Sequence, residues 1–262
     1  MKCSISISIV VYRGFDDALA AIESIERHTN PLLLKKIYII DNSAYENTNE
    51  KQSAFVASLS KFQDVIYVNT QENMGFGKGH NYVLDKIDSQ YHAIVNPDII
   101  LYEDTLSKIV DYMNHNRSVG MCIPRIVTLD GSIQPAYRRE LTIFDMFIRM
   151  FCKKGFKKRK FYHTMQDMDY SKEFSVPFGQ GSFLVIKSEL FKGLRGFDDR
   201  YFMYLEDADL CKRVNQVSSL MYYPYATAVH KWEKESHRNI RLFKIHLKSM
   251  VSYFLKWGIK WK

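Results

Sequence analysis

The amino-acid sequence predicts an α/β protein with a mostly parallel central sheet flanked by helices. Runs of apolar, β-branched residues alternate with segments of helical periodicity over residues 4–125. Such alternation builds βαβ units, whose strands lie parallel. A composition of 46% hydrophobic against 25% charged residues excludes a disordered chain, and a length of 262 residues suits one domain with an appendage.

The predicted elements follow one another along the chain without a linker. Strands are expected at Ser4–Tyr12, Lys36–Ile40, Val65–Asn69, His92–Val95 and Val119–Ile123. Helices are expected near residues 15–28, 50–62, 78–88 and 103–115. The alternation of these elements is the basis for the parallel sheet.

After residue 125 the alternation stops. Residues 141–151 show helical spacing, a smaller α+β portion extends to about residue 230, and a last helix is rich in Lys and aromatic residues. We therefore divide the chain into a main domain over 1–235, with halves 1–130 and 131–235, and a basic amphipathic helix over 236–262.

The cysteines and the N-terminus indicate a reducing, cytoplasmic setting. The four cysteines stand singly and form no CxxC pair, which fits neither a disulfide framework nor a structural zinc site. The N-terminal segment alternates Ser and Ile, which is typical of a strand and not of a signal peptide. No stretch reaches the roughly 18 apolar residues of a membrane span, so we expect any membrane contact to be peripheral.

Polar and glycine residues follow the predicted strands, at the sheet edge where parallel α/β proteins bind ligands. In the segment 41–43, Asp41 is suited to accept a hydrogen bond from a pyrimidine N3–H, although the segment also fits an Asx-turn. The segment 73–81 holds Gly75, Gly77 and Gly79 before a helix. It fits a loop that approaches a phosphate or a tight structural turn, and it matches neither a Walker A loop nor the full G-x-G-x-x-G spacing.

Asn96-Pro97-Asp98 follows a strand that reads as buried. Pro97 cannot continue a central strand, so the chain turns there and presents Asp98 at the sheet edge. A carboxylate oxygen at this place suits Mg²⁺ or Mn²⁺ shared with substrate phosphates, and a plain turn is the alternative. His230 follows another strand pattern and is a second candidate ligand or a packed residue.

Three carboxylates begin a helix near residue 206. Glu206, Asp207 and Asp209 lie in its first turn, where the helix dipole favours acidic side chains. Positions i, i+1 and i+3 cannot all face one way. One of the three is therefore a candidate general base pointing into a cleft.

Taken in order, these motifs resemble those of the inverting GT-A glycosyltransferases of family two, and in particular the bacterial members that build O-antigen, capsule and cell-wall polysaccharides. The resemblance extends from Ile5 to about Ser252. It rests on Ile9-Val10-Val11-Tyr12, Asp41-Asn42-Ser43, the segment 73–81, Asn96-Pro97-Asp98, Gly179-Gln180-Gly181-Ser182-Phe183, Gly196-Phe197-Asp198, the segment 202–210 and His230. It implies a Rossmann-like sheet with a nucleotide-sugar half, 1–130, and an acceptor half, 131–235.

The resemblance also implies a role for each matched residue. Asp207 matches the catalytic base, while Asp98 and His230 match metal ligands for Mg²⁺ or Mn²⁺. Asn96 stands where the family's Asp-x-Asp motif has its first Asp, which removes one negative charge from the metal site. The residues implied to contact the nucleotide-sugar donor are Tyr12, Asp41, Asn42, Asn73, Gly75, Gly77, Asn81, Asn96, Gly181 and Glu206.

The function implied is transfer of a sugar from a nucleoside diphosphate to a lipid-linked saccharide. The Asn-Pro-Asp variant looks most like that of rhamnosyltransferases that use dTDP-rhamnose. The alternatives are a UDP-hexose or UDP-galactofuranose transferase, a sugar nucleotidyltransferase, and a basic nucleic-acid-binding protein, which nothing in residues 1–130 favours. A homo-oligomer is left open.

The net charge of +8 is concentrated in two segments. Residues 138–160 and 231–262 each carry nine Lys or Arg and two Asp or Glu. On the last helix an aromatic stripe beside lysines indicates an interfacial helix on the inner, anionic face of a cytoplasmic membrane; packing of the stripe on the main domain is the competing interpretation. The stripe consists of Leu242, His246, Met250, Tyr253, Trp257 and Trp261.

Overall fold

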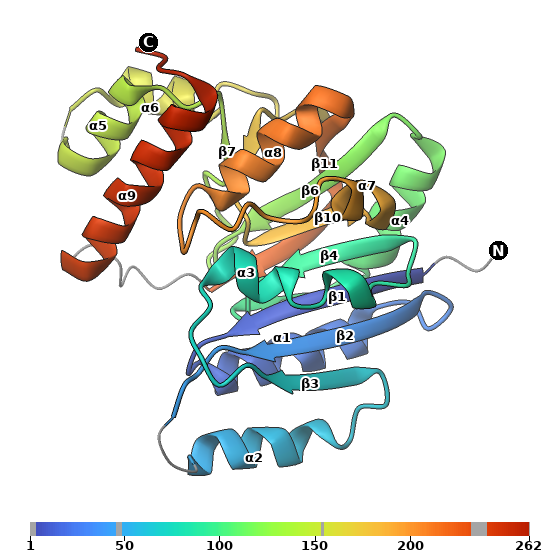
Figure 1. Cartoon of the computed structure of the whole chain (residues 1–262). Coiled ribbons are helices and arrows are strands. Elements are labelled where there is room, and N and C mark those ends of the chain that lie inside the picture. The colour runs from blue at the N-terminus through green and yellow to red at the C-terminus, as the bar shows by residue number, and fades with distance from the viewer. Residues whose placement is uncertain (1–3, 46–48, 153–154, 232–239, 262) are drawn as a thin grey trace.

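Strands from both halves of the chain join in one sheet, as the computed structural model shows for residues 4–45, 49–152, 155–231 and 240–261 (Figure 1). Within these residues the order is β3-β2-β1-β4-β10-β6-β11-β5, with β8 paired to β11. The strands are β1 Ser4–Val11, β2 Leu34–Asp41, β3 Val65–Asn69, β4 Tyr91–Val95, β5 Ile99–Ile100, β6 Val119–Val127, β8 Phe174–Ser175, β10 Phe183–Lys187 and β11 Ser219–His230. A separate ribbon pairs β7 Tyr137–Arg138 with β9 Phe178–Gly179.

Helices pack against the sheet, and some of them gather at one end of the molecule. They are α1 Phe15–His28, α2 Glu50–Leu59, α3 Phe76–Asn81, α4 Thr105–His115, α5 Ile143–Phe151, α6 Lys157–His163, α7 Ser188–Gly193, α8 Glu206–Val217 and α9 Ile240–Trp257. Figure 1 shows α5, α6 and α9 gathered beside α8, away from the parallel strands β1 to β3. The α/β class is confirmed, and the sheet is mixed because β10 runs antiparallel to both β4 and β6.

The five predicted strands of the first half and most of its helices are present. The single helix expected over 78–88 is wrong: α3 begins earlier, at Phe76, and a short 3-10 turn, Leu84–Lys86, follows after a break. Two glycines within six residues give α3 a low helix propensity, and buried Val83 stands at the break.

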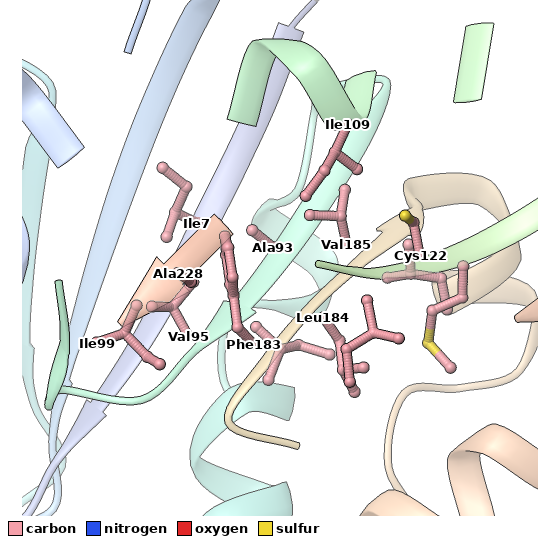
Figure 2. Packing of buried hydrophobic residues seen from close by; sticks show 14 of the residues in the cluster. Ile7, Ala93, Val95, Ile99, Ile109, Cys122, Phe183, Leu184, Val185 and Ala228 are labelled. Carbon is pink, nitrogen blue, oxygen red and sulfur yellow. The ribbon is translucent and has the colours of Figure 1, made fainter. Parts of the chain in front are cut away.

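Both faces of the central strand β1 are buried. Its isoleucines, such as Ile7, join an apolar core with residues of β4 and β10 (Figure 2). On the opposite face, Ser8 Oγ lies 2.7 Å from His80 Nδ1 and 2.9 Å from His92 Nε2. The Ser-Ile alternation of the sequence therefore serves an apolar face and a polar face, and the polar face ties α3 to the sheet.

The terminal helix α9 packs its aromatic stripe on the rest of the molecule. Tyr253 is buried, and Trp257 Nε1 donates a hydrogen bond of 2.9 Å to Asp209 Oδ1. Lys256 Nζ lies 2.6 Å from a carboxylate oxygen of both Asp198 and Asp209. The stripe therefore follows the packing interpretation as far as Trp257.

Some predictions fall on parts of the chain that the structure does not describe. The boundary between residues 235 and 236 lies outside the described residues, as do Lys153, Lys154 and Lys262 of the basic segments. Within the described part of the chain, no helix has the length and apolar character needed to cross a membrane.

Candidate active site

Asp98 and His230 come together although 132 positions separate them in the sequence. Asp98 lies on the turn after β4 and His230 ends β11, with Asp98 Oδ2 3.1 Å from His230 Nε2. The other ring nitrogen, Nδ1, lies 2.8 Å from Gln134 Oε1. When Nδ1–H donates to that amide oxygen, Nε2 and the carboxylate are both electron-pair donors, so a cation or a proton between them is needed.

The polar atoms around this pair suit a divalent cation. Asp98 Oδ1, Asn96 Oδ1 and Ser182 Oγ are buried and have no hydrogen-bond partner among the described residues. Carboxylate, amide oxygen and imidazole are the ligand types that Mg²⁺ and Mn²⁺ accept. Within the described residues no cluster of three His, Cys, Asp or Glu is present.

A short loop connects this pair to Asp207. The backbone N–H of Asn96 donates to the carbonyl of Ser182 at 2.8 Å. One residue earlier, the N–H of Gly181 donates to Asp207 Oδ2 at 3.0 Å. A Cβ on Gly181 would lie 3.1 Å from that of Asp207, so this close approach favours glycine. The turn that carries Asp98 and the carboxylate of Asp207 are therefore both bonded to one short loop, residues 181–182.

Asp207 is held as a partly exposed carboxylate. Its Oδ1 accepts a hydrogen bond of 2.8 Å from the N–H of Ala208, in addition to the bond from Gly181. Burial raises its pKa above the ordinary carboxyl value, while these two amides and the guanidinium groups of Arg138 and Arg149 act in the opposite direction. The result is an oriented carboxylate with increased basicity.

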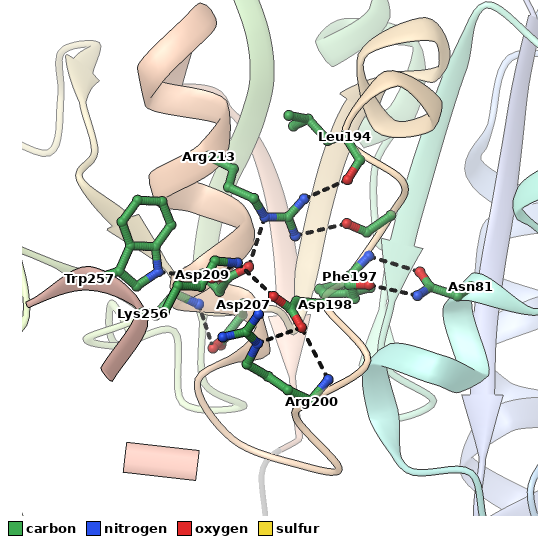
Figure 3. A network of polar contacts seen from close by, with 12 residues as sticks. Asn81, Leu194, Phe197, Asp198, Arg200, Asp207, Asp209, Arg213, Lys256 and Trp257 are labelled. Carbon is green, nitrogen blue, oxygen red and sulfur yellow. Dashed lines mark hydrogen bonds and ion pairs between the residues drawn. The ribbon is translucent and has the colours of Figure 1, made fainter. Parts of the chain in front are cut away.

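The other two acids of the first turn have different surroundings. Asp209 is fully buried, and its carboxylate oxygens bond to Arg213, Lys256 and Trp257 (Figure 3). Glu206 is 5% exposed, and its Oε2 has no partner among the described residues. Burial and then the nearby Asp207 raise the pKa of Glu206 well above its usual range. Of the three carboxylates, Asp207 alone is partly exposed.

Asp41 and Asn42, predicted to contact the donor, are bonded within the protein. Asp41 Oδ1 accepts from the N–H of Ser43 at 2.8 Å, and Oδ2 accepts from Gln52 Nε2 at 2.6 Å and from the Tyr67 hydroxyl at 2.7 Å. Asn42 is 1% exposed, and its Nδ2 donates to the carbonyl of Gly75 at 2.8 Å. Asn42 therefore fixes the glycine-rich segment in place.

The glycines of that segment are explained by close packing. A Cβ on Gly75, which has a φ of +82°, would lie 2.0 Å from the carbonyl oxygen of Phe202. A Cβ on Gly77 would lie 2.9 Å from that of Phe197, and one on Gly79 would lie 2.8 Å from a methyl group of Val10. The glycines let α3 sit directly on the second half of the chain and on β1.

The two asparagines that bracket the segment also bond to backbone groups. Asn73 Oδ1 accepts from the N–H of Gly75 at 3.0 Å. The amide of Asn81 pairs with both backbone groups of Phe197, each at 2.8 Å (Figure 3). In the protein as described, both side chains shape the site; a contact with the donor stays a prediction for each.

Tyr12 lies at the open edge of the donor half. It is 52% exposed, and the guanidinium of Arg13 lies 5.2 Å from its ring centroid and 5.6 Å from that of Tyr45. The N–H of Arg13 donates to Ser43 Oγ at 2.7 Å. An exposed aromatic ring beside a guanidinium is a surface on which a planar base can stack.

Sequence reasoning missed two features of the site. Gln134, which orients His230, lies in a stretch without a recognisable motif. Arg138 and Arg149 are electrostatic neighbours of Asp207, but their positions in the sequence were interpreted only as part of a basic segment. The net charge of that segment pointed to an anion without showing which of its cations face the site.

Solved structures share this fold. The structure of GalNAc-T7 with UDP, GalNAc and Mn²⁺ has a TM-score of 0.67 and 16% identity, over 88% of this chain and 44% of that one. The mannosyltransferase PcManGT from Pyrobaculum calidifontis, in complex with GDP-Man and Mn²⁺, has a TM-score of 0.66 and 16% identity, over 96% of this chain and 63% of that one. The fold is therefore that of the GT-A glycosyltransferases.

The sequence comparisons then identify the family. The model of glycosyl transferase family 2 matches residues 6–194, and the chain belongs to this family. It is 30% identical to the rhamnosyltransferase WbbL of Escherichia coli strain K12 over 192 residues, which are 70% of each protein. It is 25% identical to the N-acetylglucosaminyl-diphospho-decaprenol L-rhamnosyltransferase of Mycobacterium tuberculosis over 211 residues, which are 74% of this chain and 66% of that protein. The predicted resemblance is confirmed.

Proposed function

We propose that this protein is an inverting rhamnosyltransferase that moves rhamnose from dTDP-rhamnose to a lipid-linked saccharide in bacterial cell-surface polysaccharide synthesis. The relatives support the sugar, since two of them are named as rhamnosyltransferases. The mycobacterial name also contains a diphosphate-linked lipid acceptor. The observation that carries the proposal is the oriented, partly exposed carboxylate of Asp207, which is bonded to the same short loop, residues 181–182, as the turn that carries Asp98 next to His230.

In the proposed reaction Asp207 is the general base. The acceptor hydroxyl oxygen forms a bond to the anomeric carbon while the bond from that carbon to the diphosphate oxygen breaks, and the hydroxyl proton passes to the Asp207 carboxylate. Two backbone amides hold the carboxylate, so little reorientation is needed when the acceptor binds. Displacement from one face in a single step inverts the anomeric configuration.

Asp98, His230 and Asn96 would hold a Mg²⁺ or Mn²⁺ ion together with the donor diphosphate. The bound ion would offset negative charge on the leaving diphosphate. Gln134 keeps the His230 ring oriented through Nδ1, which leaves Nε2 directed at Asp98. The unpartnered oxygens of Asn96 and Asp98 support this assignment.

The donor nucleotide would lie along the carboxyl ends of β1 and β2. The exposed ring of Tyr12 supplies a stacking surface for the base. Asp41 ends β2 at this place; it is fully buried, and its bonds to Gln52 and Tyr67 fix the floor on which the base would lie. The glycine-rich segment with Gly75 and Gly77 packs closely on the second half of the chain and so holds the two halves of the site together.

We propose that the protein acts at the inner face of the cytoplasmic membrane through an apolar surface on α5, α6 and α9. The exposed large side chains of this surface are Phe147, Phe151, Phe156, Phe161, Tyr162, Ile240, Phe243, Leu247, Val251 and Leu255. Lys157, Lys158, Lys244 and Lys248 are exposed on the same helices and would meet anionic lipid headgroups. The stripe that contains Tyr253 and Trp257 is not part of this surface, because it packs inward.

The membrane proposal is tested by vesicle co-sedimentation. Leu247→Ser and Leu255→Ser together remove two exposed apolar groups without touching the packed stripe, so binding to anionic vesicles should fall while the protein stays folded. Ser252→Ala, on the same helix, is the matched control. Equal sedimentation of the double variant and the wild-type protein contradicts the assignment of this surface.

The sugar is tested by donor hydrolysis and transfer. The purified protein is offered dTDP-rhamnose, UDP-glucose, UDP-galactose, UDP-galactofuranose and UDP-N-acetylglucosamine, with a prenyl-diphosphate-linked N-acetylglucosamine as acceptor. Fastest release of dTDP, with a rhamnosylated product of inverted configuration, supports the proposal. Preference for a UDP-sugar replaces rhamnose while retaining the reaction; release of inorganic pyrophosphate from an NTP and a sugar phosphate overturns it.

A further inference from the structure

Arg138 and Arg149 make no ion pair within the described residues, which they share with the exposed Arg195 in the second half of the chain. Arg139, Arg159 and Arg213 each make an ion pair, with Asp167, Asp145 and Asp209 respectively. Among the described residues, no carboxylate lies within ion-pair distance of Arg138 or Arg149, and the contact seen for Arg138 is with the ring of Phe178, 5.3 Å from the guanidinium carbon. Two cations without acidic partners are therefore available to an external anion.

The two arginines converge from different elements on one place. Arg138 lies on β7, in register with Phe178, and Arg149 lies on α5. Both act on the ring of His246 from α9: burial and then these two guanidinium groups lower its pKa to about 4. The His246 ring lies 4.8 Å from that of Tyr204, and its Nε2 is buried without a partner among the described residues. A neutral imidazole with an unused nitrogen thus faces the same place.

The charge at this place is unbalanced. Burial and then the proximity of Arg149 lower the pKa of Arg138 to about 9, and the opposing influence comes from Asp207. His163 is also affected, since burial and the surrounding arginines lower its pKa to about 4. Among the described residues Asp207 is the carboxylate that acts on both guanidinium groups, so a ligand with two negative charges would reduce their mutual repulsion.

We propose that Arg138 and Arg149 bind the diphosphate of the lipid-linked acceptor, next to Asp207. This inference rests on the proposed function, because it assigns the acceptor a diphosphate. Guanidinium groups bind phosphate oxygens in a bidentate manner and are less strongly hydrated than ammonium groups, which suits a partly enclosed site. His246 Nε2 adds a hydrogen-bonding group at the same place.

The order of chemical groups along the acceptor matches the order of surfaces on the protein. Asp207 would take the proton of the sugar hydroxyl, and the two arginines lie next to Asp207. Phe147 and Phe151 lie on the opposite side of α5 from Arg149, because residues two positions apart on a helix point in nearly opposite directions. Both phenylalanines are more than half exposed, and the Phe151 ring lies 6.3 Å from that of Phe243 on α9. Sugar, diphosphate and lipid would therefore meet a base, cations and an apolar surface in turn.

The donor diphosphate has a separate place. It belongs with Asp98 and His230, on the other side of the loop that contains Gly181. Neither of these two residues is among the electrostatic neighbours of Arg138 or Arg149, whereas Asp207 is a neighbour of both. We therefore assign the arginines to the acceptor and not to the donor.

The first test measures binding without turnover. Farnesyl diphosphate and farnesol are titrated into the full chain, in detergent, by calorimetry. Arg138→Gln and Arg149→Gln should each weaken farnesyl diphosphate binding by about 10–100-fold, as expected for loss of a hydrogen bond to a charged group, and leave farnesol binding unchanged. Lys158→Gln removes one exposed cation from α6 and should change neither affinity. Equal loss for farnesol and farnesyl diphosphate, or no loss for either, overturns the inference.

The second test separates the acceptor from the donor. With the preferred nucleotide sugar, the two variants should raise KM for a prenyl-diphosphate-linked sugar by a similar factor and leave the KM of an alkyl glycoside acceptor and the KM of the nucleotide sugar unchanged. Arg138→Lys and Arg149→Lys keep the charge and should recover part of the affinity. A raised KM for the nucleotide sugar instead assigns the arginines to the donor diphosphate and overturns the inference. Binding of farnesyl diphosphate by a protein that shows no transfer to any acceptor would retain this site and reject the proposed function.

Discussion

The glycine-rich segment 73–81 and the surroundings of Asp207 both border the candidate active site, yet they use their polar groups differently. In the first region the side chains of Asn42, Asn73 and Asn81 bond to backbone groups of the protein itself. Around Asp207 several polar groups have no partner within the described residues, including Glu206 Oε2 and His246 Nε2. The asparagines of the first region are satisfied without a ligand, and His80 Nε2 is the buried side-chain atom of segment 73–81 that has no partner among the described residues; around Asp207 more such groups remain.

This difference distinguishes residues that hold the site in shape from residues that can contact substrates. Unsatisfied buried polar groups are unfavourable and persist where a ligand, an ion or a reaction uses them. The glycine-rich segment has the stronger motif in the sequence, but its contacts explain it as a support that holds α3 against Phe197 and Phe202. The region around Asp207 carries the groups that remain available to substrates.

Asp207→Asn tests the comparison most severely. The amide keeps the shape of the carboxylate and removes the basic oxygen, so kcat for transfer should fall by roughly 10²–10⁴ while donor affinity stays nearly unchanged. Steady-state kinetics and donor titration measure the two quantities. Asn73→Ala, in the glycine-rich segment, should change kcat far less. Turnover of the purified Asp207→Asn protein at the wild-type rate would remove Asp207 from the reaction.

Removal of the metal has the next largest expected effect. Gln134→Ala acts through His230 and should weaken Mn²⁺-supported binding of the nucleotide sugar by about 10–100-fold. Asp98→Ala and His230→Ala remove the proposed ligands themselves, so each should weaken this binding by at least as much. Calorimetric titration of the donor with Mn²⁺ and with EDTA measures this directly. Identical donor affinity in both solutions would show that the diphosphate is held by protein groups alone.

Gly75→Ala tests the structural side of the comparison. The new Cβ would lie 2.0 Å from the carbonyl oxygen of Phe202 on a backbone with a φ of +82°. Such backbone conformations alone cost a non-glycine residue about 1–3 kcal/mol, which corresponds to a Tm lower by roughly 2–10 °C. Gly14→Ala, where a Cβ meets nothing within 4 Å, is the control and should melt like the wild type. An unchanged Tm for Gly75→Ala would return this glycine to a phosphate-binding role.

The fold followed from the sequence because its signals are local. The bounds of β1 and α1 follow from periodicity within a few residues, as do those of most elements in the first half. The antiparallel strand β10 inside the sheet was not foreseen, because its neighbours β4 and β6 are distant in the sequence and the pattern of a five-residue strand carries no direction. Strand direction is a property of the tertiary structure.

The site was predicted in part, and the division has a physical cause. Asp98, His230 and Asp207 were proposed through the order of motifs, since no local pattern relates residues 132 positions apart; the structure places Asp98 beside His230, and their roles stay predictions. The packing role of Gly75 was beyond reach because its partner Phe202 lies in the other half of the chain. Arg138 and Arg149 were hidden within a basic segment, where only their three-dimensional surroundings distinguish them from exposed lysines.

Glu206→Gln should stabilise the protein, which sharpens the contrast between satisfied and unsatisfied groups. The buried carboxyl has a raised pKa in the folded state, so the unfolded chain loses its proton first and stability falls as the pH rises above the ordinary carboxyl range. The amide does not ionise, and the variant should gain on the order of 1 kcal/mol at pH 7, with a Tm higher by roughly 2–4 °C. The gain should vanish near pH 4, where both states of the wild-type protein are protonated. A lower Tm at pH 7 would mean that the carboxylate has a partner that stabilises its charge.

The smallest expected effect is a shift in the pH dependence of transfer. Arg138 favours the ionised form of Asp207 and so lowers the pKa of that carboxyl against the effect of burial. Arg138→Gln removes this influence, so the Asp207 pKa should rise and the acidic limb of kcat should move to higher pH, measured at saturating acceptor so that weaker binding does not enter. Arg138→Lys keeps a positive charge and should leave the limb near its wild-type position, although it lacks the bidentate geometry that suits a diphosphate. The limb should also be unaffected by Lys158→Gln, which removes an exposed cation from α6. If Arg138→Gln leaves the acidic limb in place, a base other than Asp207 controls the reaction. The contrast between the two regions would then not include Asp207 as the base.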